Sequence, residues 1–140
     1  MATTRKATTT WSGTLLEGSG EVELQSSGIG TFPVTWASRS NETAEGLTSP
    51  EELIAAAHAS CFSMALSSAL AKQGNPVKSM STTAEVDFVP GTGITEIRLA
   101  LSGEAEGLDA SGFAAAAAVA KENCPVSKAL AGLPIKLSVN

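Results

Sequence analysis

The sequence predicts one α+β domain over residues 1–140, with antiparallel sheets around two helices. Three observations support this prediction. Segments in which apolar and polar residues alternate occupy the first third of the chain and return in its middle. A long alanine- and leucine-rich segment with a marked start separates them, and a second alanine tract follows near the C-terminus. The predicted order of elements is therefore β-β-β-α-β-β-α-β.

The first third of the chain predicts three short strands. The segments ATTTWSGTLLEG and GEVELQSSG alternate and are joined near Gly18 and Gly20, and TFPVTWAS follows the turn SSGIG. The next stretch, residues 39–50, is polar and has no periodicity, so it predicts a loop that opens at Arg39.

The start of the first long helix is marked by several residues. Ser49 is suited to the N-cap, Pro50 to the first helical position, and Glu52 completes a capping box with Ser49. Alanine and leucine continue the helix to about Gln73, where GNP stops it. Its middle is apolar nearly all round, which predicts a buried helix.

The rest of the chain predicts a hairpin, a helix and a last strand. KSMSTTAEVDFVP and ITEIRLALSGEAEG alternate on either side of a glycine turn. Asp109 is suited to cap the second helix, and Pro125 kinks or restarts that helix because proline lacks an amide donor. LPIKLSVN predicts a terminal strand. The expected inward residues of the hairpin are Val86, Phe88, Ile94, Ile97, Leu99 and Leu101.

Composition excludes several classes of function. The formal net charge is −5, and three arginines with six lysines form no basic stripe, so we expect no nucleic-acid partner. The N-terminus lacks the apolar region of a signal peptide. No apolar run approaches the roughly 20 residues of a membrane span, so we expect no membrane partner and a cytoplasmic location. Thiols stay reduced in the cytoplasm, where two cysteines indicate core residues or a working redox pair.

Cys61 lies in the middle of the long helix, and two interpretations compete for it. A free cysteine packs as a small hydrophobic residue and is commonly buried in a core. A reactive cysteine has to be a thiolate, and the helix N-terminus lies too far from Cys61 to favour one. A reactive Cys61 therefore requires a cation from elsewhere, and arginine suits this role because it stays charged.

Arg39 is the best candidate for that cation. Arg5 lies near the terminus, and Arg98 alternates outward on the hairpin, whereas Arg39 precedes the cysteine helix. A carboxylate of Glu51 or Glu52 is suited to hold the arginine. On one straight helix Glu51 is about 15 Å from Cys61, so it acts through the arginine or serves a second subunit. We favour a dimer in which Glu51 serves the cysteine of a second subunit. The alternatives are that Arg39 is a solvated surface residue and that the two glutamates only complement the helix dipole.

His58 and Cys124 are the other two candidates for a reactive side chain. His58 lies three residues before Cys61 on the same helical face, and a hydrogen-bonded core histidine is a simpler explanation than a Cys–His ion pair. One histidine and two cysteines lack zinc-ligand spacing, so we expect neither a metal nor a cofactor. Cys124 precedes Pro125 at a break in the second helix, where it has the freedom that a resolving cysteine needs; a cysteine at a plain helix junction is the alternative.

These segments resemble a known family. SPEELIAAAHASCFSMALSSAL together with ENCPVSKAL is similar to the osmotically inducible protein C and organic hydroperoxide resistance proteins, the OsmC/Ohr family. The resemblance covers nearly the whole chain, and AAHASCFSMAL is closer to the OsmC branch. It implies an OsmC/Ohr-like fold and an intertwined homodimer with two sites at the subunit interface. Cys61 matches the family's peroxidatic cysteine, Cys124 its resolving cysteine, Glu51 its glutamate and Arg39 its arginine.

The resemblance also implies a reaction. Arg39, oriented by Glu51, stabilises the Cys61 thiolate, which attacks an organic hydroperoxide and, more weakly, hydrogen peroxide. Cys61 becomes a sulfenic acid and condenses with Cys124, and an external dithiol reduces the resulting disulfide. Phe62, Met64 and Met80 either line the approach of the peroxide or pack in the core.

Two other functions compete with this one. In the first, the protein is a non-catalytic stress-inducible binding or structural protein with cysteines in its core. In the second, it is a thiol oxidoreductase that acts on protein disulfides, although it has no Cys-x-x-Cys pair.

Overall fold

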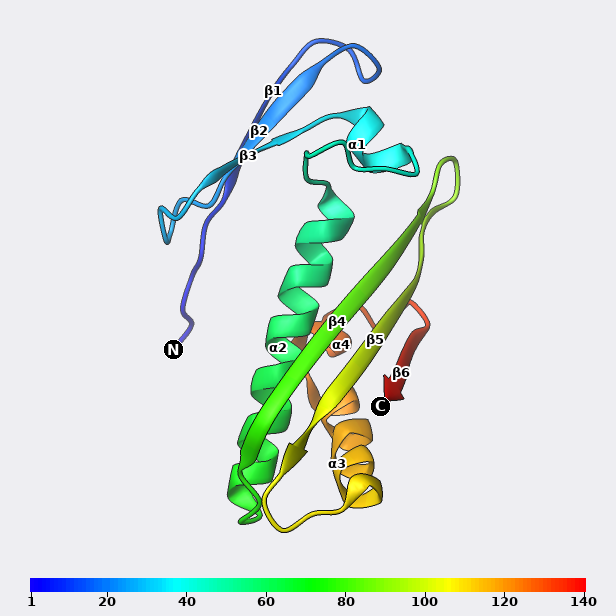
Figure 1. The fold of residues 1–140 in the computed structure, drawn as a ribbon. Coiled ribbons are helices and arrows are strands. Elements are labelled where there is room, and N and C mark those ends of the chain that lie inside the picture. Colours follow the sequence, from blue (N-terminus) through cyan, green and yellow to red (C-terminus); the bar gives the residue numbers. More distant parts are fainter. The chain divides into compact units, whose positions relative to one another are not determined.

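The computed structural model describes all residues, 1–140, and they form two compact units, Met1–Glu51 and Glu52–Asn140. The order of elements along the chain confirms an α+β fold with the predicted strands and long helices, plus two short helices (Figure 1). That residues 1–140 form a single domain stays a prediction.

The first unit contains an antiparallel three-stranded sheet. Strands β1 (Thr8–Ser12), β2 (Ser19–Glu23) and β3 (Thr31–Val34) pair in the order β1-β2-β3. Gly20 lies opposite Trp11, and a Cβ there would come within 2.8 Å of the indole ring, so this position requires glycine. The predicted pair of strands is confirmed, but their connection ends at Gly18, and Gly20 lies within β2.

The predicted third strand is too long. Strand β3 ends at Val34, and helix α1 (Trp36–Ser40) takes the remaining residues, so Arg39 lies in a helix and does not close a strand or open a loop. The cause is a capping box, in which Thr35 Oγ1 accepts from the Ser38 amide and Ser38 Oγ accepts from the Thr35 amide, each at 3.0 Å. This pair of short-range bonds starts a helix that strand periodicity does not indicate.

The second unit places two long helices and one short helix beside a sheet (Figure 1). Its elements are the greater part of α2 (Pro50–Lys72), β4 (Val77–Val89), β5 (Gly93–Ala105), α3 (Ala110–Asn123), α4 (Pro125–Ala129) and β6 (Ile135–Val139). The hairpin β4–β5 is confirmed, as are the Asp109 cap, which accepts from the Gly112 amide at 2.8 Å, and the restart at Pro125. The Ser49 cap stays a prediction.

One strand pairing differs from the expected antiparallel arrangement. Strand β6 pairs with β5 in parallel, from Ile97 opposite Ile135 to Leu101 opposite Val139. The chain leaves β5 and returns through α3 and α4, and such a helical crossover brings the next strand back in the same direction. A strictly antiparallel sheet is therefore wrong for the second unit.

The core of this unit lies between α2, α3 and β5. It is formed by Phe62, Leu66, Leu70, Leu99, Leu101, Ala105, Phe113, Ala117, Ala120 and Cys124. Of the residues expected to point inward on the hairpin, Ile97, Leu99 and Leu101 are buried, whereas Val86, Phe88 and Ile94 are half-buried. Burial is thus concentrated on β5, which lies between its two neighbours in the sheet.

Helix α2 corrects the prediction that no apolar run approaches the length of a membrane span. Its 23 residues make it long and apolar enough to cross a membrane by length and composition alone, which contradicts the expected absence of such a run. A single helix of this kind is weak grounds for a membrane span, because core helices pass the same test. The absence of a membrane partner and the cytoplasmic location stay predictions.

Candidate active site

The two cysteines lie together in the second unit. Cys61 is half-buried in the middle of α2, and Cys124 is fully buried at the junction where α3 ends and α4 begins. Both are free thiols, and their side chains lie within hydrogen-bonding reach of each other. The fold thus brings together two cysteines that are 63 residues apart in the sequence.

The surroundings of the two sulfurs differ. Burial raises the pKa of the Cys61 thiol and the neighbouring Cys124 thiol raises it further, while the Val126 amide opposes both. Burial also acts to raise the pKa of Cys124, but the nearby Ser127 amide, Cys61 thiol and Ser127 hydroxyl together outweigh burial, so that pKa lies below its ordinary value. None of these influences is a cation, so the second unit by itself does not favour a Cys61 thiolate.

In the first unit, Arg39 forms an ion pair with Glu51. Arg39 Nε donates to Glu51 Oε1 at 3.0 Å and to Oε2 at 3.3 Å, and Arg39 Nη2 lies 2.9 Å from Oε1. The Glu51 side chain is 8% exposed and that of Arg39 31%, so little water competes for the carboxylate. The structure brings this predicted pair together, and its catalytic role stays a prediction.

His58 is a buried, hydrogen-bonded residue, as expected. Its Nε2 lies 2.8 Å from Ser127 Oγ, and burial lowers the pKa of the imidazole, which keeps it neutral. Ser127 was not among the residues predicted for the site. Its position three residues after Cys124, on the first turn of a helix that starts with proline, is the signal that could have identified it.

The three apolar residues near Cys61 have different environments. Phe62 is fully buried in the core, Met80 packs partly buried against the core, and Met64 is 71% exposed. Phe62 and Met80 therefore pack as core residues. No group of three or more His, Cys, Asp or Glu side chains lies where it could hold a metal ion.

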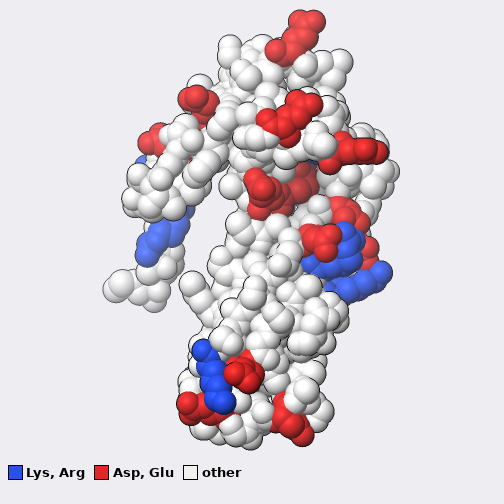
Figure 2. All heavy atoms as spheres, in the orientation of Figure 1, with Lys and Arg blue, Asp and Glu red and all other residues white.

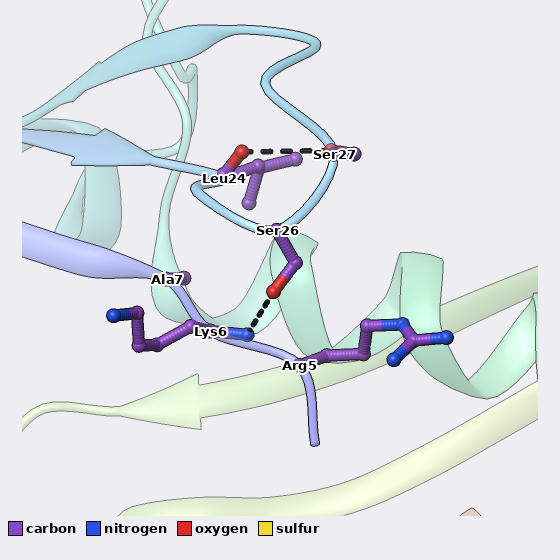
Figure 3. Close-up of a pocket in the computed structure, with 6 residues that line it drawn as sticks. All are labelled: Arg5, Lys6, Ala7, Leu24, Ser26 and Ser27. Atoms are coloured by element: carbon purple, nitrogen blue, oxygen red, sulfur yellow. Dashed lines mark hydrogen bonds between the residues drawn. The ribbon is translucent and has the colours of Figure 1, made fainter. Parts of the chain in front are cut away.

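Two charged surface features contain none of the predicted site residues. A hollow of about 410 Å³ in the first unit is lined by Arg5, Lys6, Ala7, Leu24, Ser26 and Ser27. Figure 3 shows the Arg5 and Lys6 side chains pointing in opposite directions, so they do not form a paired cationic site. In the second unit, Arg98 forms ion pairs with Glu85, Asp87 and Glu96. On the face drawn in Figure 2, basic side chains occur in small groups among acidic ones.

The fold and the adjacent cysteines define an α+β thiol protein, and comparison with known proteins assigns the family. The sequence model of OsmC-like proteins matches residues 43–139. Peroxiredoxin OsmC of Escherichia coli (strain K12) is 40% identical over 129 residues, which covers 90% of this chain and 89% of that protein. The chain therefore belongs to the OsmC-like protein family.

Solved structures agree with this fold. An organic hydroperoxide resistance protein OsmC from Legionella pneumophila has a TM-score of 0.74 and 30% identity, with coverage of 100% of this chain and 98% of the other. The organic hydroperoxide resistance protein OhrB of Bacillus subtilis has a TM-score of 0.73 and 24% identity, with coverage of 96% and 98%.

Proposed function

We propose that this protein is a cysteine-based peroxidase that reduces organic hydroperoxides to alcohols. The observation that carries the proposal is the pair of free thiols, one half-buried and one fully buried, in reach of each other. The relative named peroxiredoxin OsmC supports a peroxidase, and the Legionella pneumophila protein, named for organic hydroperoxide resistance, supports the class of substrate.

In the proposed reaction, Cys61 attacks the peroxide. Its partial exposure supports this assignment, because Cys124 is fully buried and a substrate has to reach the attacking sulfur. The Cys61 thiolate attacks one oxygen of the O–O bond, the bond breaks, and the other oxygen leaves as alkoxide and takes up a proton to form the alcohol. Cys61 is thereby oxidised to a sulfenic acid.

Cys124 then resolves the sulfenic acid. Its sulfur attacks the Cys61 sulfur, the S–O bond breaks, and the hydroxide leaves as water with the proton that Cys124 releases. The product is a Cys61–Cys124 disulfide, which an external dithiol reduces by exchange. The adjacent thiols support this step, since no long movement of α3 or α4 is needed.

We further propose that Arg39, oriented by Glu51, supplies the positive charge that favours the Cys61 thiolate. The Cys61 surroundings in the second unit raise its pKa, so an additional cation is required for reaction near neutral pH. A guanidinium held by a buried carboxylate is suited to this, because it keeps its charge and a fixed orientation. We place this site in a homodimer. The arginine near a given Cys61 comes either from the same subunit or from the partner subunit.

Reaction with a hydroperoxide tests the proposal. Reduced protein is mixed with a slight excess of cumene hydroperoxide, and free thiols and intact mass are measured. We expect both thiols to disappear, with a mass loss of about two hydrogens, and no such loss in Cys61→Ser. If both thiols stay free and the peroxide is not consumed, the cysteines are core residues and the peroxidase assignment is wrong.

A further inference from the structure

A buried hydrogen bond links the same two helices that carry the cysteines. His58 on α2 lies three residues before Cys61, and Ser127 on α4 lies three residues after Cys124. The 2.8 Å bond between His58 Nε2 and Ser127 Oγ therefore runs one helical turn away from the cysteine pair. His58 is 0% and Ser127 6% exposed, so water does not replace this bond.

The environment of His58 defines which ring nitrogen carries the hydrogen. His58 Nδ1 is buried and has no hydrogen-bond partner. A hydrogen on Nδ1 would be an orphaned buried N–H, which is rare and costly, whereas a hydrogen on Nε2 leaves a bare lone pair at Nδ1. The neutral ring therefore carries its hydrogen on Nε2 and donates it to Ser127 Oγ.

This direction leaves the Ser127 hydroxyl with its own hydrogen to donate. Cys124 is the N-cap residue of α4 and Ser127 lies in the first turn of that helix. Cys124 therefore lies one turn before Ser127 on the same helix, and the Ser127 hydroxyl acts to lower the pKa of Cys124. The bond from His58 and the place of Ser127 one turn after Cys124 suit a chain of donors from His58 through Ser127 to the charged Cys124 sulfur.

We propose that His58 and Ser127 are positioning residues for the resolving step: their hydrogen bond holds α4 beside α2, and Ser127 donates to the Cys124 sulfur that attacks oxidised Cys61. In that step the S–S bond forms, the S–O bond of the sulfenic acid breaks, and water leaves with the proton of Cys124. The inference rests on the proposed function for its role in catalysis, but the donor chain can be measured without peroxide.

Two pairs of variants separate hydrogen bonding from packing. The amide nitrogen of glutamine can occupy the place of His58 Nε2, whereas that of asparagine corresponds to Nδ1, so His58→Gln retains the donor and His58→Asn loses it. Ser127→Ala removes the hydroxyl, and Ser127→Thr retains it. Far-ultraviolet circular dichroism and the urea midpoint report whether each variant is folded.

The first readout is the titration of Cys124 in a Cys61→Ser background, followed by the ultraviolet absorbance of the thiolate. We expect Ser127→Ala and His58→Asn to raise the midpoint, and His58→Gln to leave it near that of the parent. Equal midpoints in all variants would overturn the inference, as would equal effects of His58→Gln and His58→Asn. If Ser127→Ala does not fold, the difference between the Cys124 midpoints of His58→Gln and His58→Asn tests the inference.

The second readout is the rate of disulfide formation after one equivalent of cumene hydroperoxide. We expect Ser127→Ala and His58→Asn to form the disulfide about tenfold more slowly, with sulfenic acid formation at Cys61 unchanged. Equal slowing of both steps would indicate a general structural role and would overturn the inference. If the peroxide is not consumed by the parent protein, the proposed function fails, and the titration still decides whether the donor chain exists.

Discussion

The guanidinium of Arg39 contacts the Glu51 carboxylate through two nitrogens, with Nε 3.0 Å and Nη2 2.9 Å from Oε1. Because the carboxylate is nearly buried, the pair fixes the arginine in one orientation. Arg39, which the sequence predicts only at the edge of a loop, is thereby held by Glu51, twelve positions later in the chain.

The first prediction concerns this pair. Glu51→Gln removes the charge that holds Arg39, so we expect the thiolate of Cys61 to be less favoured and its reaction with cumene hydroperoxide to be about tenfold slower. Arg39→Lys retains a charge but loses the paired contact, and we expect an intermediate rate. Glu42→Gln makes the same change at an exposed loop residue and serves as the control. Equal rates for Glu51→Gln and Glu42→Gln would contradict the proposed role.

The second prediction concerns the fate of Cys61 without its partner. In Cys124→Ser the sulfenic acid cannot form the disulfide, so repeated peroxide should carry Cys61 on to sulfinic and sulfonic acid. Intact mass spectrometry would show the addition of two or three oxygens, with loss of turnover. A Cys124→Ser protein that turns over at the parent rate, with unmodified mass, would show that Cys124 is not the resolving cysteine.

The third prediction concerns the core. Leu101 is fully buried between strands and helices of the second unit, so Leu101→Ala should lower the free energy of unfolding by about 2–5 kcal/mol. Val119 is 57% exposed on α3, and we expect Val119→Ala to change stability by no more than about 0.5 kcal/mol. Urea unfolding followed by circular dichroism measures both, and equal losses would contradict the packing described.

The fourth prediction concerns the cap of α3 and its dependence on pH. The Gly112 amide and then the Ser111 hydroxyl lower the pKa of Asp109. A carboxyl with a lower pKa in the folded state stabilises the fold above its unfolded pKa of about 3.9, and this contribution is lost as the pH falls through the folded value. We therefore expect the urea midpoint of the parent to exceed that of Asp109→Ala near neutral pH, with the difference shrinking in acid.

Asp109→Asn is the matched control for this cap. Asparagine also caps helices but does not titrate in this range, so its urea midpoint relative to Asp109→Ala should be nearly independent of pH. A parent protein whose advantage over Asp109→Ala is equal at neutral and strongly acidic pH would contradict the ionised cap.

The fifth prediction concerns the homodimer. Only 22% of the most apolar stretch of α2 is buried within one chain, and Met64 on this helix is 71% exposed. An apolar surface of this kind is typical of an interface. We expect sedimentation equilibrium to give twice the 14.1 kDa mass of the chain, and Met64→Glu to shift the protein toward monomer. A parent protein that sediments as a monomer would contradict the dimer.

The sequence by itself determined the elements whose causes are local. Asp109 accepts from an amide three residues away, Pro125 restarts a helix because it has no amide hydrogen, and strict alternation defines the β4–β5 hairpin. The two cysteines and their flanking residues likewise indicated the family, because that signal lies in short contiguous motifs.

The tertiary structure alone decided what depends on residues distant in sequence. The parallel pairing of β6, the contact of Cys61 with Cys124 and the His58–Ser127 bond each join segments more than thirty residues apart. Spacing along the chain does not specify such contacts, because the path of the intervening helices sets them. Helix α1 was not predicted from the sequence, because its capping box interrupts a stretch whose composition favours a strand.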